Sequence, residues 1–152
     1  MNSTKPVVRA ITEAELEAAI ALDNKTTGRS RRGFYLKRFA ASQQSPESFV
    51  WLASMMGDKL VGFVSAHVLD GEFGGTEPAA VIDAIGVLPE ARGKGIARTL
   101  LETLEVQLKA RKITNLYTEA DWVEHDLVQF FAAAGFQLAP SLVLESAVTT
   151  NF

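Results

Sequence analysis

Residues 84–98 of the chain read AIGVLPEARGKGIAR. The apolar start is typical of a buried strand, Pro89 closes a short turn, and glycines on both sides of Lys94 lead directly into a helical pattern. A loop of this kind leaves main-chain N–H groups unpaired, and the helix dipole adds positive potential in front of them. The stretch therefore predicts a phosphate-binding loop between a strand and a helix.

Apolar spacing and turn residues on both sides of this loop predict an α/β (α+β) fold. Strands are predicted at residues 7–11, 49–56, 60–68, 79–87, 115–120, 136–138 and 141–145. Helices are predicted at residues 12–24, 30–42, 95–110 and 123–134. Residues 70–78 contain several glycines and a proline, so we expect a loop there.

Length and composition favour one ordinary globular domain spanning residues 1–152. Apolar residues make up 47% of the 152 residues and charged residues 22%, both close to the average for folded proteins. Cysteine is absent, which excludes disulfides, thiolate metal sites and a cysteine nucleophile. The two histidines, His67 and His125, lack the spacing of metal ligands, so we expect no metal.

Charge and hydropathy bear on location and on macromolecular partners. The net charge of −3 argues against a nucleic-acid surface, and the basic residues at 29–38 are typical of a solvated helix face. The N-terminus has no apolar segment of the signal-peptide kind, and no apolar run reaches the length of a membrane span. We therefore expect a cytoplasmic protein with no membrane or nucleic-acid partner.

Three kinds of phosphate-binding loop compete for residues 92–98. A Walker-type P-loop is excluded, because no lysine here has the required spacing from two glycines and a hydroxyl residue. A dinucleotide fingerprint comes closer, since Gly93 and Gly95 open a helix and Glu119 ends the next strand. Arg98 occupies its third glycine position, however, and too few residues follow for a doubly wound sheet. The third kind is an acyl-CoA pyrophosphate loop.

The run Arg92-Gly93-Lys94-Gly95-Ile96-Ala97 fits the pattern Arg/Gln-x-x-Gly-x-Gly/Ala of such a loop. Together with Ile85-Gly86-Val87-Leu88-Pro89 and the distant Ala134-Gly135-Phe136, it resembles the signature of the GNAT superfamily of acyl-CoA-dependent N-acetyltransferases. The resemblance covers roughly residues 7–145. It implies a GNAT-like mixed, mainly antiparallel central sheet of about seven strands flanked by about four helices.

The resemblance implies transfer of an acetyl group from acetyl-CoA, as co-substrate, to a primary amine by direct attack in a ternary complex. The Val87 N–H would face the thioester oxygen and stabilise the oxyanion. A non-catalytic acyl-CoA-binding regulatory domain on the same fold is the alternative. The expected cofactor-binding residues are Ile85, Gly86, Val87, Arg92, Gly93, Lys94, Gly95, Ile96, Ala97 and Arg98.

Two carboxylates are the candidate catalytic residues. Asp83 is expected to share strand parity with Val81, Ile85 and Val87, where it would serve as the base, or else to pair with the basic residues at 29–38. Glu119 is the second candidate. Where the family often carries a tyrosine acid, this chain has Phe131, so water, the substrate, Tyr117 or Tyr35 would have to protonate the thiolate.

Acidic and aromatic residues are the candidate acceptor-binding groups. Glu72 and Glu77 in the glycine-rich loop, with Trp122 after a strand, would suit a cationic amine, whether a small molecule or a protein amine. A solvated loop without a ligand is the other reading of the same residues. A homodimer is compatible with the sequence.

Overall fold

The computed structural model describes residues 5–71, 75–120 and 124–148. The chain divides into two units, Met1–Glu119 and Ala120–Phe152. The single domain over residues 1–152 stays a prediction. Within the described ranges, no helix combines the length and the hydropathy that a membrane span needs.

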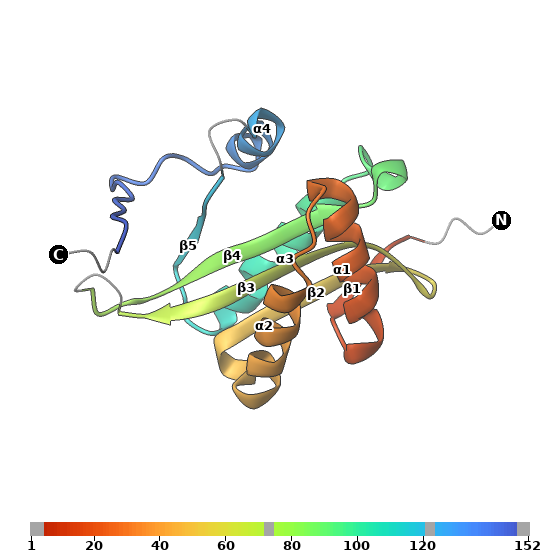
Figure 1. The fold of residues 1–152 in the computed structure, drawn as a ribbon, viewed down its shortest axis with the longest axis horizontal. Coiled ribbons are helices and arrows are strands. Elements are labelled where there is room, and N and C mark those ends of the chain that lie inside the picture. Colours follow the sequence, from red (N-terminus) through yellow and green to blue (C-terminus); the bar gives the residue numbers. More distant parts are fainter. Residues whose placement is uncertain (1–4, 72–74, 121–123, 149–152) are drawn as a thin grey trace. The chain divides into compact units, whose positions relative to one another are not determined.

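The first unit is built on a five-stranded sheet with the order β1-β2-β3-β4-β5 (Figure 1). The strands are β1 (Val7–Ala10), β2 (Phe49–Met56), β3 (Lys59–Asp70), β4 (Pro78–Val87) and β5 (Asn115–Thr118). The pairings from β1 to β4 are antiparallel, and β4 pairs with β5 in parallel. Parallel neighbours need a crossover connection, and the chain between β4 and β5 supplies it as a helix. The expected mixed sheet is confirmed.

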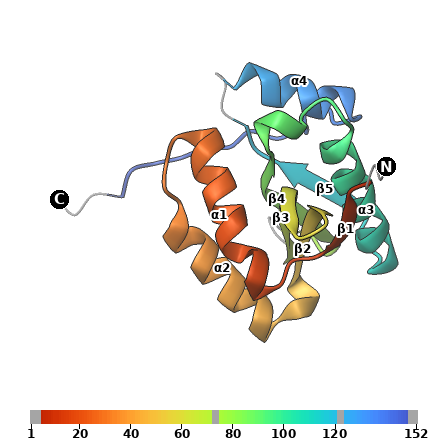
Figure 2. The same ribbon diagram turned by 90° about the vertical axis from the view of Figure 1, so that its right-hand side faces the viewer.

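Helices cover both faces of this sheet. Figure 2 shows α1 (Glu13–Thr27) and α2 (Arg32–Gln44) on one face and α3 (Ile96–Ala110) on the other. Phe63 of β3 lies fully buried in the core beneath α1 and α2, where its ring contacts that of Tyr35. On the opposite face, Leu100 and Leu104 of α3 are fully buried. The helical spacing of these leucines is why the sequence predicts α3 so closely.

The second unit contains α4 (His125–Ala133). The helix ends before Gly135, whose φ of +100° is a conformation that residues with a side chain rarely adopt. The Phe131 and Phe136 rings pack edge to face, with centroids 4.9 Å apart. With α4 the described chain has four α-helices, as expected.

The expectation of about seven strands is wrong, because the described part of the chain forms five. Residues 136–138 and 141–145 have no regular secondary structure. Their large apolar side chains are exposed, Leu138 by 96% and Leu144 by 88%. An alternating apolar segment becomes a strand only where a neighbouring edge accepts its hydrogen bonds, and here no described strand does so.

Candidate active site

Strands β4 and β5 part halfway along β4. Their parallel pairing runs from Ala79 opposite Asn115 to Ile82 opposite Thr118 and then stops. Beyond Ile82, β4 keeps β3 on one side, and its other edge has no strand partner among the described residues. Main-chain groups on that edge are free to bind an extended ligand.

The Val87 amide faces this open edge. The next residue, Leu88, donates its N–H to the Val61 carbonyl on β3, with an N···O distance of 2.9 Å. Neighbouring residues in a strand point their N–H groups to opposite sides, so the N–H of Val87 points away from β3. The edge thus offers a hydrogen-bond donor at the end of β4.

A β-bulge interrupts β4 at Asp83. Ala66 of β3 lies opposite Ile82, and the preceding Ser65 lies opposite Ala84, so Asp83 is an extra residue with no opposite on β3. A bulge of this kind places two consecutive residues against one partner and increases the local twist. It lies where β4 and β5 part.

The two faces of the sheet are identified by residues of β3. Phe63 packs beneath α1 and α2. Gly62 faces α3, because a Cβ built on it would lie 2.9 Å from Ile96 Cγ2. Residues directly opposite each other on paired strands share a face, so Val87, opposite Gly62, lies on the α3 face. By alternation, His67 lies on the same face as Phe63.

Asp83 therefore lies on a different face from Ile85 and Val87. Its carboxylate meets His67, which is opposite Val81 on the α1 and α2 face, whereas Ile85 and Val87 lie on the α3 face. The expectation that Asp83 shares strand parity with Val81 is consistent with this arrangement, but the expected parity with Ile85 and Val87 is wrong. The extra residue at the bulge shifts the alternation by one.

The partner of Asp83 is His67. Its Oδ2 lies 2.8 Å from Nδ1 of His67, and the two side chains are 11% and 18% exposed. The sequence also allowed Asp83 to pair with the basic residues at 29–38. Two of these residues bind other carboxylates, since Arg31 pairs with Asp23 and Arg32 with Glu17. Within the described ranges, no third acidic or histidine side chain joins the pair to make a metal-binding group.

Sequence reasoning missed the pairing of His67 with Asp83. His67 stands 16 residues before Asp83, and only the register of β3 against β4 brings the two side chains together. The available signal was a histidine and an aspartate on consecutive strands of one predicted antiparallel pair. That signal does not specify the register.

The loop after β4 adopts the conformation that its glycines allow. A 3-10 turn, η3 (Pro89–Ala91), precedes Gly93 and Gly95, whose φ angles are +80° and +78°. A Cβ built at either glycine would have nothing within 4 Å. The glycines are thus needed for the backbone conformation, and the space beside them is open.

Unpaired amides follow one another through this loop. From Gly93 to Arg98, no main-chain N–H donates a hydrogen bond within the described chain. The next amide, that of Thr99, donates to the Gly95 carbonyl as the first hydrogen bond of the helix. The side chains of Lys94 and Arg98 form no ion pair with any described residue. Consecutive donors at a helix N-terminus beside two cations fit a pyrophosphate.

The remaining candidate residues are spread over β4 and β5. Glu119 is exposed and follows Thr118, the last residue of β5 paired with β4, which puts it at the level of Asp83. Glu77 is exposed before the start of β4, six residues from Asp83, or ~20 Å along a strand. Glu72 and Trp122 lie outside the described residues.

The residues considered as proton donors differ in exposure. Tyr35 is fully buried, and burial raises the pKa of its hydroxyl above the usual range, so it is unsuited to protonate a ligand. Tyr117 on β5 is 45% exposed. Phe131 packs its ring against Phe136 and offers no proton.

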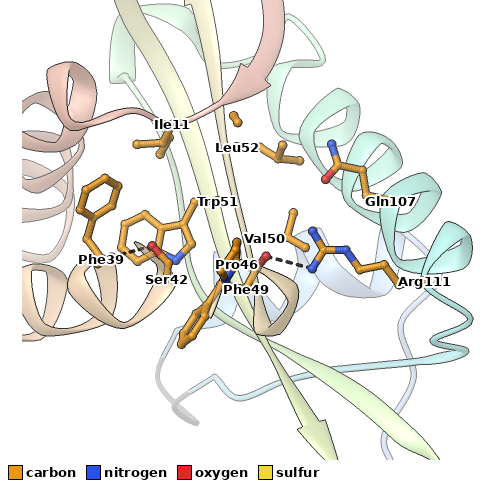
Figure 3. A pocket seen from close by; sticks show the side chains of 11 residues that line it. Ile11, Phe39, Ser42, Pro46, Phe49, Val50, Trp51, Leu52, Gln107 and Arg111 are labelled. Carbon is orange, nitrogen blue, oxygen red and sulfur yellow. Dashed lines mark hydrogen bonds between the residues drawn. The ribbon is translucent and has the colours of Figure 1, made fainter. Parts of the chain in front are cut away.

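A separate pocket of about 200 Å³ opens at the outer edge of β2. Arg111, the residue after α3, reaches across this edge and donates a hydrogen bond to the main-chain carbonyl of Phe49, at 3.0 Å (Figure 3). The indole N–H of Trp51 is buried beside the pocket without a hydrogen-bond partner in the described chain. None of the residues predicted from the sequence as functional lines this pocket.

Comparisons with known proteins identify the fold. The model of the Acetyltransferase (GNAT) family matches residues 11–136. No curated protein matches the sequence significantly.

Several solved structures have the same fold at low sequence identity. The aminoglycoside 6'-N-acetyltransferase AAC(6')-Ig from Acinetobacter haemolyticus is 21% identical, with a TM-score of 0.78 over 94% of this chain and 99% of that one. AAC(6')-Iy in complex with a CoA bisubstrate analogue is 16% identical, with a TM-score of 0.80 over 95% and 99%. A transcriptional regulator from Bacillus halodurans is 18% identical, with a TM-score of 0.78 over 94% and 99%.

Proposed function

Because the chain belongs to the Acetyltransferase (GNAT) family, we propose that it transfers an acetyl group from acetyl-CoA to a small primary amine. The observation that supports this most directly is the run of unpaired amides at residues 93–98, which continues from the open edge of β4. The loop amides suit a pyrophosphate, and the open edge of β4 suits an extended arm attached to that pyrophosphate. In acetyl-CoA the pyrophosphate is followed by such an arm, the pantetheine, which ends in the thioester.

The loop residues would hold the pyrophosphate. Amides of Gly93, Lys94, Gly95, Ile96, Ala97 and Arg98 donate to its oxygens, while the side chains of Arg92, Lys94 and Arg98 add positive charge at the rim. Arg92 is also tied to the strand, since its Nε donates to the Val87 carbonyl at 3.4 Å. That contact joins the loop to the end of β4.

The open edge of β4 would hold the pantetheine arm and the thioester. Main-chain groups of Ile85, Gly86 and Val87 lie along the segment that β5 leaves free. The Val87 N–H, which points away from β3, would donate to the thioester oxygen as negative charge develops there. One donor of this kind contributes about 3 kcal/mol to stabilisation of the transition state in comparable enzymes.

The proton of the attacking amine would be accepted near the bulge. Asp83 is the first candidate, because it lies where β4 and β5 part, four residues before Val87 on the same strand. Glu119 is the second, one residue beyond the last paired residue of β5. Both are acidic, so either would also favour a cationic acceptor.

The acceptor class is drawn from charge and from the structural neighbours. Two of the neighbours are aminoglycoside 6'-N-acetyltransferases, whose acceptors are amines. Exposed Glu77 and Glu119 on this chain are suited to a cationic small molecule, and Glu72 and Trp122 remain candidates for the same role. A small polycationic amine fits these features best.

Release of free CoA thiol across a panel of amines tests the proposal. We expect turnover with at least one polycationic amine and acetyl-CoA binding measurable by calorimetry. Binding of acetyl-CoA without turnover on a wide panel would instead favour the acyl-CoA-binding regulator. That second function is kept because Phe131 supplies no proton donor and because one neighbour is a transcriptional regulator.

A further inference from the structure

The outer edge of β2 is open where β1 ends. β1 stops at Ala10, opposite Leu52, and Ile11 adds one more main-chain hydrogen bond, to the Trp51 carbonyl at 2.9 Å. The pocket of about 200 Å³ lies here, between the start of β2, α2 with η1 (Pro46–Ser48), and the last turn of α3 (Figure 3). We propose that it binds a small carboxylate whose short apolar body carries a carbonyl oxygen at the opposite end.

This inference goes beyond the proposed acetyl transfer. Every residue that lines the pocket belongs to the first unit, and none belongs to the proposed cofactor loop. Helix α3 begins at that loop and ends at the pocket, so about 20 Å of helix separates the two sites. Two features carry the inference, an arginine with free donors and a buried indole N–H without an acceptor.

Arg111 supplies a cation at one end of the pocket. Its Nη1 donates to the main-chain carbonyls of Glu47 and Phe49, both at 3.0 Å, which holds the guanidinium against the edge of β2 (Figure 3). Its Nε and Nη2 donate to no described residue, and it forms no ion pair within the described ranges. Arg31 uses these same two atoms to bind the carboxylate of Asp23. The free side of Arg111 is thus suited to bidentate binding of a carboxylate.

Trp51 supplies a donor at the other end. The residue is 7% exposed, and its buried Nε1 has no hydrogen-bond partner in the described chain. The neighbouring Ser42 hydroxyl does not accept from it and donates to the Phe39 carbonyl at 2.6 Å. An indole N–H can only donate, and native proteins rarely leave such a group unpaired. Because Nε1 lies just under the pocket wall, an acceptor reaches it through a small shift of wall side chains, of which Phe49 is only half-buried.

Apolar side chains make up most of the lining. Ile11, Phe39 and Leu52 are buried there. On the side of Arg111, the Gln107 amide projects from α3 toward β2 and forms no side-chain hydrogen bond with a described residue (Figure 3). Pockets for drug-sized ligands measure about 300–1,000 Å³, so this one suits a smaller molecule with one ring or a short branched chain.

Charge near the pocket favours an anion over an amine. Within one turn of Arg111 along the chain, the charged residues are Lys109 and Lys112, and neither forms an ion pair with a described residue. The acidic residue of η1 is Glu47, which is exposed. Three cations against one carboxylate leave this rim positive. The site therefore differs in charge preference from the acidic residues assigned to the acceptor amine.

Titration with para-acetylbenzoate, followed by NMR, tests the Arg111 end. We expect the neutral para-acetylbenzamide to bind about tenfold more weakly, and Arg111→Gln to remove most of that difference. Arg111→Lys keeps the charge without the fork and should fall between Arg111→Gln and the parent. Arg29→Gln removes the same charge from the exposed segment after α1 and is the matched control.

Two results of this titration would overturn the inference. One is the absence of saturable binding of para-acetylbenzoate to the parent. The other is an equal affinity of Arg111→Gln and the parent for that molecule. Thermal unfolding of each variant shows whether it is folded, and the exposed position of Arg111 leads us to expect that it is.

The indole N–H signal tests the Trp51 end. With two tryptophans in the chain, a Trp122→Phe spectrum assigns the Trp51 signal. We expect para-acetylbenzoate to move the indole proton of Trp51 downfield. The isosteric para-isopropylbenzoate has a methyl group in place of the oxygen, so it should move the signal less and bind about two- to tenfold more weakly. A Trp51 indole signal unmoved at saturating para-acetylbenzoate would overturn the inference.

Acetyl-CoA separates this pocket from the proposed cofactor site. Saturating acetyl-CoA should leave the affinity for para-acetylbenzoate unchanged, because the two sites lie at opposite ends of α3. Displacement of para-acetylbenzoate by acetyl-CoA would place the carboxylate in the cofactor site and overturn the inference. None of these measurements needs turnover, so a failure of the proposed acetyl transfer would leave their outcome unchanged.

Discussion

Asp83 is the residue of β4 that has no opposite on β3, and its Oδ2 lies 2.8 Å from Nδ1 of His67. The two facts are connected, because the bulge lets the carboxylate stay on the α1 and α2 face while the chain beyond it changes phase. Beyond the bulge, β4 leads into the proposed phosphate-binding loop with the Val87 amide toward the open edge. One inserted residue thus relates the proposed proton acceptor to the proposed cofactor site.

Gly95→Glu should abolish acetyl-CoA binding, because the new side chain would project into the open space beside the loop amides and add negative charge there. Gly57→Glu is the matched control, since Gly57 also has a positive φ of +62° and nothing within 4 Å of a built Cβ. Both substitutions should cost about 1–2 kcal/mol of folding stability from the left-handed backbone. Calorimetry in which Gly95→Glu and Gly57→Glu bind acetyl-CoA equally well would place the cofactor elsewhere.

Lys94→Gln and Arg98→Gln should each weaken acetyl-CoA binding by about five- to tenfold at low salt, because each removes a cation from the rim of an anionic site. The effect should diminish as the salt concentration rises. Lys59→Gln, at the exposed start of β3, is the control and should bind like the parent at every salt concentration. Losses that are the same for all three lysine and arginine variants would contradict a local phosphate site.

Arg31→Leu should lower the free energy of unfolding by about 3 kcal/mol, because it leaves the buried carboxylate of Asp23 without its cationic partner. Arg31 donates to that carboxylate from Nε at 2.9 Å, and Asp23 is 4% exposed. Arg32→Leu removes a comparable ion pair with Glu17, but both of its side chains are at least half exposed, so the expected change is within about 0.5 kcal/mol. Urea unfolding at neutral pH measures the free energy of unfolding of both variants. Equal decreases for Arg31→Leu and Arg32→Leu would contradict the expected difference between a buried and an exposed ion pair.

Stability should fall in acid through Glu15. The side-chain hydrogen bond from Arg9, at 2.7 Å, lowers the pKa of Glu15 to about 2 from 4.5, with further hydrogen bonds from Thr12. Because the folded-state pKa lies below the unfolded one, this stabilisation is complete above pH 4.5 and is lost as the pH falls toward 2.

Glu15→Gln measures that contribution. The variant should be about 1 kcal/mol less stable than the parent at neutral pH, and the difference should vanish near the folded-state pKa. Glu13→Gln, exposed in the same first helical turn, should change stability by a few tenths of a kcal/mol. A Glu15→Gln deficit that persists unchanged at pH 2 would show that the ion pair is not its cause.

Much of the fold was predictable from the sequence, for reasons visible at single residues. The spacing of Ile96, Leu100 and Leu104 identifies α3, because side chains three and four apart share one face of a helix. The hairpin of β2 and β3 follows from apolar runs on either side of Gly57, whose positive φ suits a tight turn. The two strands expected after residue 135 are wrong, because pairing requires an edge that the sequence of the segment does not contain.

The conformation of the proposed phosphate loop was determined by the sequence alone, because positive φ at Gly93 and Gly95 is a local property of residues without a Cβ. The bulge at Asp83, the contact with His67 and the parting of β4 from β5 were decided only by the tertiary structure. Each depends on how separate strands align, as with His67 and Asp83, which are 16 residues apart in the chain. Alternation along one strand cannot reveal a shift of one residue against its neighbour. The proposed cofactor site can thus be read from one stretch of sequence, whereas the contact between Asp83 and His67 exists only once the strands are in register.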